Sequence, residues 1–406
     1  MTGTYTDFVG KDPNPFLSDM RARGRVVWDD GIKSWLITDM EDVSYVLRHE
    51  DEFTIPFPGY GFSDFFGRRA LLVLEGEAHR QLYLAVRRCF TPEAAQRYRE
   101  RFILPIIEDR MARIIPAGRG ELTTDYAEQI PVRVIAGVLG LDWLDDALIR
   151  NCWDWIDAYQ VHLLNYILPG DAPERTRAAA VAGMRKMDDA LMPLVEAKDE
   201  QPEDSYVRVV DAAGRDFFPD WSDSDTVDQC KFLFVAGMHT STALMCNAIH
   251  FLLTDPELMA KVAEDPDAQL APFVEETLRL RPSIQLRPRV AARDMHWHGS
   301  DIEKGDQVLA ILASANRSPE RFEHPDVLDT SRDQLGRHLS FNSGQRFCGG
   351  APLARVEAVE SLRAVVTRMP ALRLDSSQPP PQYSGFIQRT MRPLHVLFDA
   401  QQAVTR

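Results

Sequence analysis

The sequence predicts a mainly α-helical protein with a small β region. Residues 222–254 are the most informative stretch, because Ser222-Asp223-Ser224-Asp225 is an N-terminal capping pattern and Thr254-Asp255-Pro256 stops the helix. Such a helix spans ~47 Å at ~1.5 Å per residue, enough to cross a whole domain. Further helices are expected at residues 13–23, 40–49, 77–89, 102–115, 130–140, 145–167, 172–198, 271–280 and 352–369.

The β region is expected from short segments near both ends of the chain. Strands at residues 25–28 and 34–37 are joined through Asp29-Asp30-Gly31, which is a good hairpin turn. After Pro282, residues 284–291 are expected to form a strand that leads into a small sheet.

Length and charge limit the classes of protein that fit. The 406 residues show no compositional break or linker, so residues 1–406 are expected to form one domain, and we expect a monomer. A formal net charge of -15 argues against a nucleic-acid partner. No apolar run approaches the ~18 residues of a membrane span, residues 134–141 being the longest tract. Residues 1–7 lack the basic and apolar parts of a signal peptide, so we expect a cytoplasmic protein that binds no membrane.

One of the five cysteines stands in an unusual setting. The five are odd in number, widely spaced and without a Cys-x-x-Cys pair, which argues against a disulfide framework and a zinc site. Cys348, however, lies between Gly344 and the pair Gly349-Gly350 and just before a helix that begins at Pro352. Backbone N–H groups and the helix dipole favour a thiolate there. A structural cysteine in a Gly-rich turn is the alternative.

Two helices carry further patterns. The predicted helix 222–254 is apolar on all sides around Gly237, and a glycine costs ~1 kcal/mol relative to alanine in a helix interior. Some other gain should offset that cost. Three residues on, Thr240 either serves chemistry or only bonds back to a helix carbonyl. On the helix 271–280, Glu276 and Arg279 have the spacing of a charge-assisted pair.

The run Phe341-x-x-Gly344-x-Arg346-x-Cys348-x-Gly350 resembles the haem-ligand signature of the cytochromes P450, the haem-thiolate monooxygenases, of the soluble bacterial type. The resemblance implies a triangular, mostly α fold. It implies haem b with the Cys348 thiolate as axial ligand. It also implies insertion of one oxygen atom from dioxygen into a substrate bond, with two electrons supplied one at a time.

The long helix is similar to the family's Ala-Gly-x-acid-Thr motif at Ala236, Gly237 and Thr240. In the family, the glycine makes room for dioxygen and the threonine helps to deliver protons, so Gly237 and Thr240 are expected to act in catalysis. His239 stands where the acid is usual. Because a histidine titrates near ~6.5, we expect that it could carry protons itself.

The resemblance also suggests which residues hold the haem propionates. His79 and Tyr83 lie four residues apart on one helix face, where the family usually has a histidine and an arginine. His79 is expected to bind a propionate and Tyr83 to act only as a hydrogen-bond donor. Arg289 and Arg346 match two propionate-binding arginines, but Arg287 lies close enough to Arg289 to compete for that assignment.

Glu276 and Arg279 match the family's buried pair that braces the cysteine loop together with a further arginine. The alignment puts Val327 at the position of that arginine. The tetrad Pro319-Glu320-Arg321-Phe322 looks like the corresponding motif but lies one segment too early. Which arginine completes the triad is therefore left open.

Residues 53–67 combine aromatic side chains with Gly and Pro, so they either plug an edge of the core or line a pocket. The resemblance favours the pocket, and a small apolar or aromatic substrate. Arg68-Arg69 could anchor an acidic substrate or simply be solvated. The candidates for the pocket are Phe57, Tyr60, Tyr159, Leu163, Tyr166, Ala236, Leu286, Phe386 and Ile387.

Electrons are expected from a separate redox protein, which the resemblance suggests is a ferredoxin fed by an NAD(P)H-dependent reductase. Arg87, Arg88, Arg346 and Arg355 are expected to form a basic docking patch for it. Two other functions stay open. One is a haem-thiolate enzyme that is driven by peroxide or rearranges oxygenated substrates, and the other is a non-catalytic haem carrier or sensor.

Overall fold

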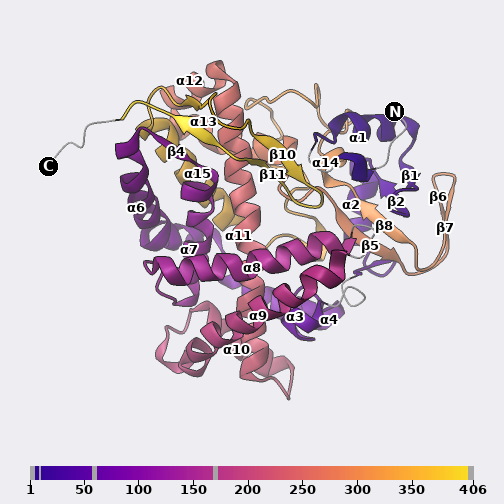
Figure 1. The fold of residues 1–406 in the computed structure, drawn as a ribbon. Helices are drawn as coiled ribbons and strands as arrows, with labels where there is room; N and C mark the ends of the chain where they lie inside the picture. The colour runs from indigo at the N-terminus through magenta and orange to yellow at the C-terminus, as the bar shows by residue number, and fades with distance from the viewer. Residues whose placement is uncertain (1–4, 9–10, 57–61, 168–171, 401–406) are drawn as a thin grey trace.

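Helix α11 (Asp223–Thr254) runs through the centre of the protein (Figure 1). The computed structural model describes residues 5–8, 11–56, 62–167 and 172–400. The predicted capping box is present: the Ser222 side chain accepts a hydrogen bond from the backbone N–H of Asp225, and the Asp225 carboxylate accepts one from the N–H of Ser222. At the other end, Asp255 terminates α11 and caps α12 (Pro256–Glu264) by accepting from Leu258 N–H. The sequence therefore predicted both ends of this helix.

By length and composition, α11 could cross a membrane, contrary to the expectation that no segment approaches that size. However, 67% of its most apolar 18-residue window is buried within the protein. Helix α11 is buried by the helices around it, as the core helix of a folded domain is. Its length and composition are therefore weak evidence for a membrane span.

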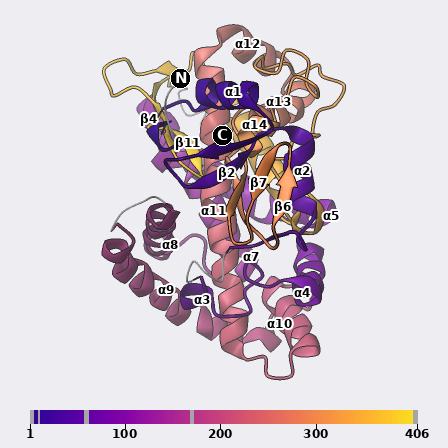
Figure 2. The same cartoon turned by 90° about the vertical axis from the view of Figure 1, so that its right-hand side faces the viewer.

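The other helices surround α11, with α8 and α9 packed side by side (Figure 2). The helices before it are α1 (Asn14–Arg23), α2 (Met40–Arg48), α3 (Ser63–Phe66), α4 (Gly76–Arg88), α5 (Pro92–Tyr98), α6 (Leu104–Ile114), α7 (Gln129–Leu139), α8 (Asp146–Ile167), α9 (Ala172–Glu196) and α10 (Tyr206–Phe217). The helices after α12 are α13 (Pro266–Leu280), α14 (Leu312–Ala315) and α15 (Ala351–Arg368). Helix α13 begins five residues before its predicted start, because Asp265 caps it through Ala268 N–H.

The β region consists of one larger sheet and three small ones. The five-stranded sheet has the order β1-β2-β8-β5-β3, and the small sheets are β10-β11, β4-β12-β9 and β6-β7. The strands are β1 (Val26–Asp29), β2 (Ser34–Ile37), β3 (Phe53–Thr54), β4 (Arg119–Glu121), β5 (Arg287–Ala291), β6 (Met295–Trp297), β7 (Ser300–Ile302), β8 (Gln307–Ala310), β9 (Arg373–Leu374), β10 (Gln382–Gly385), β11 (Arg389–Arg392) and β12 (His395–Leu397). The predicted hairpin is confirmed, with Val26 opposite Ile37. Strand β5 is shorter than its predicted range.

The five-stranded sheet is buried on both faces, because neighbouring residues of a strand point to opposite sides. In β2, Leu36 packs with α1 while Ile37 packs with α2. The much larger helical core is gathered around α11 and includes side chains of α4, α7, α8 and α15. The expected mainly α fold with a small β region is confirmed. Strand β5 of the five-stranded sheet leads away from the middle of α11.

Candidate active site

The cysteine loop presents one sulfur atom at the start of α15. Cys348 N–H donates to Phe341 O at 2.8 Å, which closes the loop. The backbone N–H groups of Gly350 and Ala351 point at the sulfur, as a helix N-terminus should. Burial nevertheless raises the pKa of the Cys348 thiol, and these N–H groups, Arg287 and Arg355 only partly oppose it. The helix terminus alone therefore does not produce a thiolate, and a metal ion that binds the sulfur would have to displace the proton.

The glycines of this loop have different roles. Gly344 has φ +70°, and a Cβ there would lie 2.9 Å from Cγ of Arg48 on α2, so a side chain would be strained and crowded. Gly349 and Gly350 do not lie in the left-handed region. At Gly350, an added Cβ would lie 4.0 Å from the Cys348 sulfur. Its small size keeps the vicinity of the sulfur open.

Helix α13 braces the loop through Glu276, which is almost completely buried. Arg279 binds it with two bonds, Nε to Oε1 at 2.7 Å and Nη2 to Oε2 at 2.8 Å. The further arginine is Arg332, whose Nε donates to Glu276 Oε2 at 3.1 Å. Val327, at the aligned position, contributes only its carbonyl oxygen, which accepts from both arginines, and Arg321 is exposed. The buried carboxylate is thus fully paired, as its burial requires.

The neighbouring carboxylate, Glu275, makes a second brace that the sequence did not reveal. It contacts His338 before the cysteine loop at 3.2 Å and Arg355 after it, with Nε to Oε1 at 2.6 Å. These partners hold the pKa of Glu275 at about 2 despite its burial. Arg355 is therefore engaged within the protein, and its place in a docking patch stays a prediction. Arg346 is engaged as well, through Glu50 at 2.8 Å.

One face of α11 is accessible in the middle of the protein. Ala236 is exposed and Thr240 half-buried, although the helix around them is largely buried. The Thr240 hydroxyl donates to Ala236 O at 2.7 Å, so the alternative of a back-bond to the helix is what the structure has. The hydroxyl oxygen keeps lone pairs for a further donor. Ser283 Oγ donates to Thr240 O at 2.7 Å and ties the segment before β5 to this point.

Gly237, next to this accessible face, is half-buried and packs closely against α7. A Cβ at Gly237 would lie 2.9 Å from Cδ1 of Ile135 on α7. The glycine therefore permits close packing of α11 against α7, and this packing offsets its helix penalty. Ala236 is the exposed small residue of this face, and the expected catalytic role of Gly237 stays a prediction beside its packing role.

The His239 side chain faces α8, and its ring is not readily charged. Its ring lies 4.7 Å from that of Trp153, and Nε2 is 3.9 Å from Asp157 Oδ1. Burial, and next the nearby Arg392, lower the pKa of His239 to about 4. The ring is neutral at neutral pH, which corrects the expectation based on an ordinary histidine pKa.

Several buried nitrogen atoms near the cysteine loop have no partner. Within the part of the chain that the structure describes, Arg289 Nε and Nη2, Arg287 Nε and His79 Nδ1 form no hydrogen bond. Burial, Arg346 and Arg287 lower the pKa of Arg289 to about 10. Burial, and then Arg346, lower the pKa of His79 to about 4, so its ring is neutral. A buried cation without an anion is costly, and these side chains therefore form an anion site.

Tyr83 belongs to the loop rather than to this anion site. Its ring stacks on His79, and its hydroxyl donates to Phe347 O at 2.7 Å. The hydroxyl is a hydrogen-bond donor, as expected, but it holds the residue before Cys348. The expected part of Tyr83 in cofactor binding is thus corrected to support of the loop.

Comparison with known proteins identifies the family. A family model described as Cytochrome P450 matches residues 209–396. Cytochrome P450 monooxygenase PikC of Streptomyces venezuelae is 30% identical over 380 residues, which cover 91% of this chain and 87% of PikC. The chain belongs to the cytochrome P450 family. A putative cytochrome P450 of Bacillus subtilis, YjiB, is 28% identical over 371 residues, 90% of each chain.

Solved P450 structures confirm the fold. P450BioI, in complex with an acyl carrier protein ligated to hexadec-9Z-enoic acid, has a TM-score of 0.83 at 24% identity and covers 97% of this chain and 100% of its own. CYP109E1 from Bacillus megaterium, in complex with testosterone, has a TM-score of 0.82 at 23% identity, covering 98% and 100%. The expected cytochrome P450 fold is confirmed, and the protein is an oxidoreductase of the monooxygenase class.

P450 enzymes carry haem b with an axial cysteine thiolate, and the residues of this P450 fit that group. Its two propionates would supply the anions that the unpartnered nitrogens of Arg289 and His79 lack. Cys348 is surrounded by protein, yet part of its surface is accessible, so its sulfur borders an internal space. Among the described residues, no group of three or more His, Cys, Asp and Glu side chains could hold a metal ion.

Several of the predicted pocket residues are buried in the core instead of lining this space. Tyr159 is 1% exposed, and its ring packs against Phe65 and Phe66 at 5.2 and 4.9 Å, so the described part of the aromatic segment plugs the core. Leu163 is half-buried and packs against the same core. Phe57 and Tyr60 lie outside the described residues, as does the side chain of Tyr166.

The C-terminal pocket candidates belong to the core between α1 and the sheet. Phe386 packs on Tyr5 at 4.9 Å, Leu286 is completely buried in the same cluster, and Ile387 packs against it. Phe386 and Leu286 are wrong as pocket contacts, because both are buried in this core, whereas Ile387 is half-buried and its pocket role stays a prediction. Arg69, suggested as an anchor for acids, pairs with Asp220 at 2.5 Å and Asp225 at 3.3 Å.

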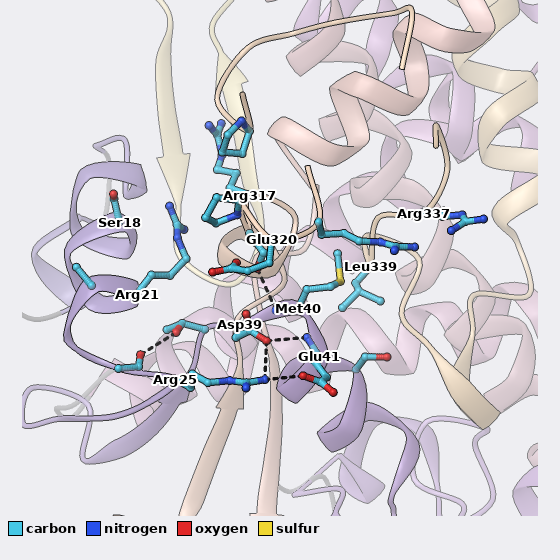
Figure 3. Close-up of a pocket in the computed structure, with 18 of the residues that line it drawn as sticks. Ser18, Arg21, Arg25, Asp39, Met40, Glu41, Arg317, Glu320, Arg337 and Leu339 are labelled. Atoms are coloured by element: carbon cyan, nitrogen blue, oxygen red, sulfur yellow. Dashed lines mark hydrogen bonds and ion pairs between the residues drawn. The ribbon is translucent and has the colours of Figure 1, made fainter. Parts of the chain in front are cut away.

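A surface hollow of about 840 Å³ lies elsewhere, between α1, α2 and the segment after α14 (Figure 3). Arg25 binds Asp39 and Glu41 there, each at 2.9 Å. The hollow contains none of Ala236, Thr240 and Cys348. Its charged lining is unlike an apolar substrate pocket, so we place the active site at the accessible face of α11 and the cysteine loop.

Proposed function

We propose that Cys348 is the axial ligand of the haem in this P450, and that the enzyme oxidises a small, largely apolar organic molecule with dioxygen and electrons from a separate redox protein. The observation that carries the proposal is the juxtaposition of an accessible sulfur at a helix N-terminus with buried nitrogens that lack an anion. Arg287 lies within electrostatic reach of both Cys348 and Arg289, so the sulfur and the anion site border the same space.

The haem, when bound, supplies the redox-active iron that activates dioxygen. Cys348 would hold the iron, while Arg289, Arg346 and His79 would hold the propionates. Thr240 lies where a hydroxyl group can position a proton donor, since its own proton is given to Ala236 O. His239 contributes a neutral ring beside Asp157, whose half-exposed carboxylate connects this region with solvent. The proton path we propose thus leads from solvent through α8 to α11.

The apolar nature of the substrate is supported by the small Ala236 surface on α11. The ligands of the two solved relatives, testosterone for CYP109E1 and a hexadecenoyl chain for P450BioI, are largely apolar. A non-catalytic haem carrier or sensor is disfavoured, because the chain belongs to a family of monooxygenases.

Reduction of the purified protein under carbon monoxide tests the ligand assignment. We expect the red-shifted Soret band that a thiolate ligand gives, and its loss in Cys348→Ala. The buried cysteines provide a matched control, and Cys152→Ala should keep the band because that thiol lies in the core. A normal band in Cys348→Ala would overturn the assignment.

The source of electrons is tested by the conditions for turnover. We expect product only with a reductase, a ferredoxin and NAD(P)H. Turnover at an equal or higher rate with hydrogen peroxide alone would instead support the peroxide-driven alternative. The observation that favours this alternative is His239, which stands where the family usually has an acid.

A further inference from the structure

Arg287 is a buried cation that the cofactor assignment leaves without a role. It is the first residue of β5 and stands opposite Ala310 of β8, while Arg289 stands opposite Val308. Because side chains two apart on a strand share a face, the two guanidinium groups start from the same side of β5. Like charges so placed repel each other, which only anions can offset.

The two arginines differ in their surroundings. Arg289 is 2% exposed and has Glu50 and Glu75 within electrostatic reach, in addition to Arg346. Arg287 remains partly accessible, and its Nε is buried without a partner. Across the described ranges, Arg287 has no ion pair with a carboxylate, and Cys348, whose buried thiol has a raised pKa, is the titratable group that acts on it.

Along the chain, Arg287 lies between Ser283, which is bound to α11, and Arg289, which belongs to the anion site. Ser283, four residues earlier, is bound to Thr240 O on α11, and Arg289 lies two residues later. At about 3.3 Å per residue, Arg287 lies at most ~13 Å from Ser283 along this extended segment. Ile284 and Arg287 are the residues between Pro282 and Arg289 that keep accessible surface. Arg287 is within electrostatic reach of the Cys348 sulfur, so its accessible part lies on the side of the cysteine loop, at the end of this segment that is remote from Thr240.

We propose that Arg287 binds the carboxylate of the substrate, so that the substrates of this enzyme are organic acids whose apolar part lies against Ala236. The proposal rests on the haem site proposed above. The propionates already have Arg289, Arg346 and His79 as partners, so Arg287 is the cation left for an anion from outside. Such an acid would be oxidised at a carbon remote from its carboxylate, because the anchor lies at the far end of the segment from Thr240.

Optical titration of the ferric holoenzyme with matched ligands tests this inference. The probes are linear, branched and aromatic carboxylic acids, each paired with its methyl ester. We expect the wild-type enzyme to bind the preferred acid at least tenfold more tightly than its ester. Arg287→Gln should remove this difference by weakening the acid and not the ester, and Arg287→Lys should keep part of it. Arg373→Gln, at an exposed arginine of β9, is the matched control and should bind as the wild type does.

Haem content and the reduction potential of each variant separate the inference from its main rival, a third arginine on the propionates. If Arg287→Gln loses haem or changes its potential while the acid-to-ester ratio stays unchanged, Arg287 belongs to the cofactor and the proposal is overturned. It is also overturned if the wild type prefers none of the acids to its ester. The carbon monoxide spectrum is recorded first, so a failure of the haem assignment is recognised independently.

Discussion

Single buried ionisable residues govern much of the chemistry around α11, and Glu357 is the clearest case outside the site itself. It lies on α15, is 2% exposed, and hydrogen-bonds to Ser241 of α11. Burial raises the pKa of Glu357 from 4.5 to about 8. The side chain is therefore protonated at neutral pH, and its carboxyl group accepts the hydrogen bond that Ser241 donates between the two helices.

The raised pKa predicts how stability depends on pH. Because the folded pKa exceeds the unfolded one, the contribution of Glu357 is complete below pH ~4.5 and is lost as pH rises through about 8. At about 1.4 kcal/mol per pH unit, the free energy of unfolding should fall by a few kcal/mol over this window. Glu357→Gln keeps the hydrogen bond without the ionisation, so its melting temperature should fall less between pH 5 and 8.

Melting curves of the wild type, Glu357→Gln and Glu264→Gln at several pH values check this prediction. Glu264 is an exposed glutamate of α12, and its amide variant should follow the wild type. Equal pH dependence in all three proteins would show that Glu357 ionises in the folded state as it does in water.

At the scale of elements, α13 fixes the cysteine loop through a buried carboxylate with two arginines, and this arrangement makes a comparison of arginines decisive. Arg332→Ala removes one donor from Glu276 and should cost about 1–3 kcal/mol. Arg279→Ala leaves the buried carboxylate without its bidentate partner and should cost about 3–5 kcal/mol. Arg321→Ala, at the arginine of the similar tetrad, should stay within about 0.5 kcal/mol of the wild type because it is exposed.

Chemical unfolding of the three variants, with haem content measured in parallel, provides the test. Arg332→Ala and Arg279→Ala should also retain less haem, since the carboxylate holds the segments that flank the loop. A loss of stability in Arg321→Ala as large as that in Arg332→Ala would contradict the assignment of the triad.

Elements with local signals were predicted well from the sequence, whereas contacts set by the path of irregular segments were not. The ends of α11 depend on Ser222 and Asp255, which act within one turn, so both were predicted. Arg332 comes from a segment without regular structure, and no spacing rule could place it on Glu276. Phe386 failed for a related reason, since an extended segment does not reveal which of its faces meets the core.

At the site, the predicted motif residues were brought together, but their roles depend on burial. Cys348 lies at a helix N-terminus, and Arg289 and His79 have buried nitrogens without a partner, so their assignment to the haem stays a proposal. His239 could not be judged from the sequence, because its neutral ring is set by burial and by Arg392 from distant β11. The packing of Gly237 on Ile135 is likewise a tertiary contact that no local pattern reveals.

At the scale of the whole molecule, the strongly acidic charge makes any basic surface near the cysteine loop important for a redox partner. Arg346 and Arg355 are withdrawn into ion pairs, but Arg87 and Arg88 are exposed at the end of α4. Two exposed apolar side chains accompany them, Leu84 one turn earlier on α4 and Phe347 beside Cys348. Tyr83 links α4 to the loop through Phe347 O, so the four side chains form one surface, which we call the α4 face.

We predict that an acidic ferredoxin docks on the α4 face, with charge guiding the encounter and the apolar pair forming the dry centre. Arg87→Glu should slow reduction by the ferredoxin several-fold at low salt, and the difference should shrink as salt screens the charges. Lys33→Glu, in the β1–β2 turn, changes the net charge equally and should have little effect. Stopped-flow reduction at several ionic strengths measures both. Equal slowing in the two variants would mean that only the overall charge matters, and an Arg87→Glu enzyme reduced as fast as the wild type would remove the α4 face as the docking site.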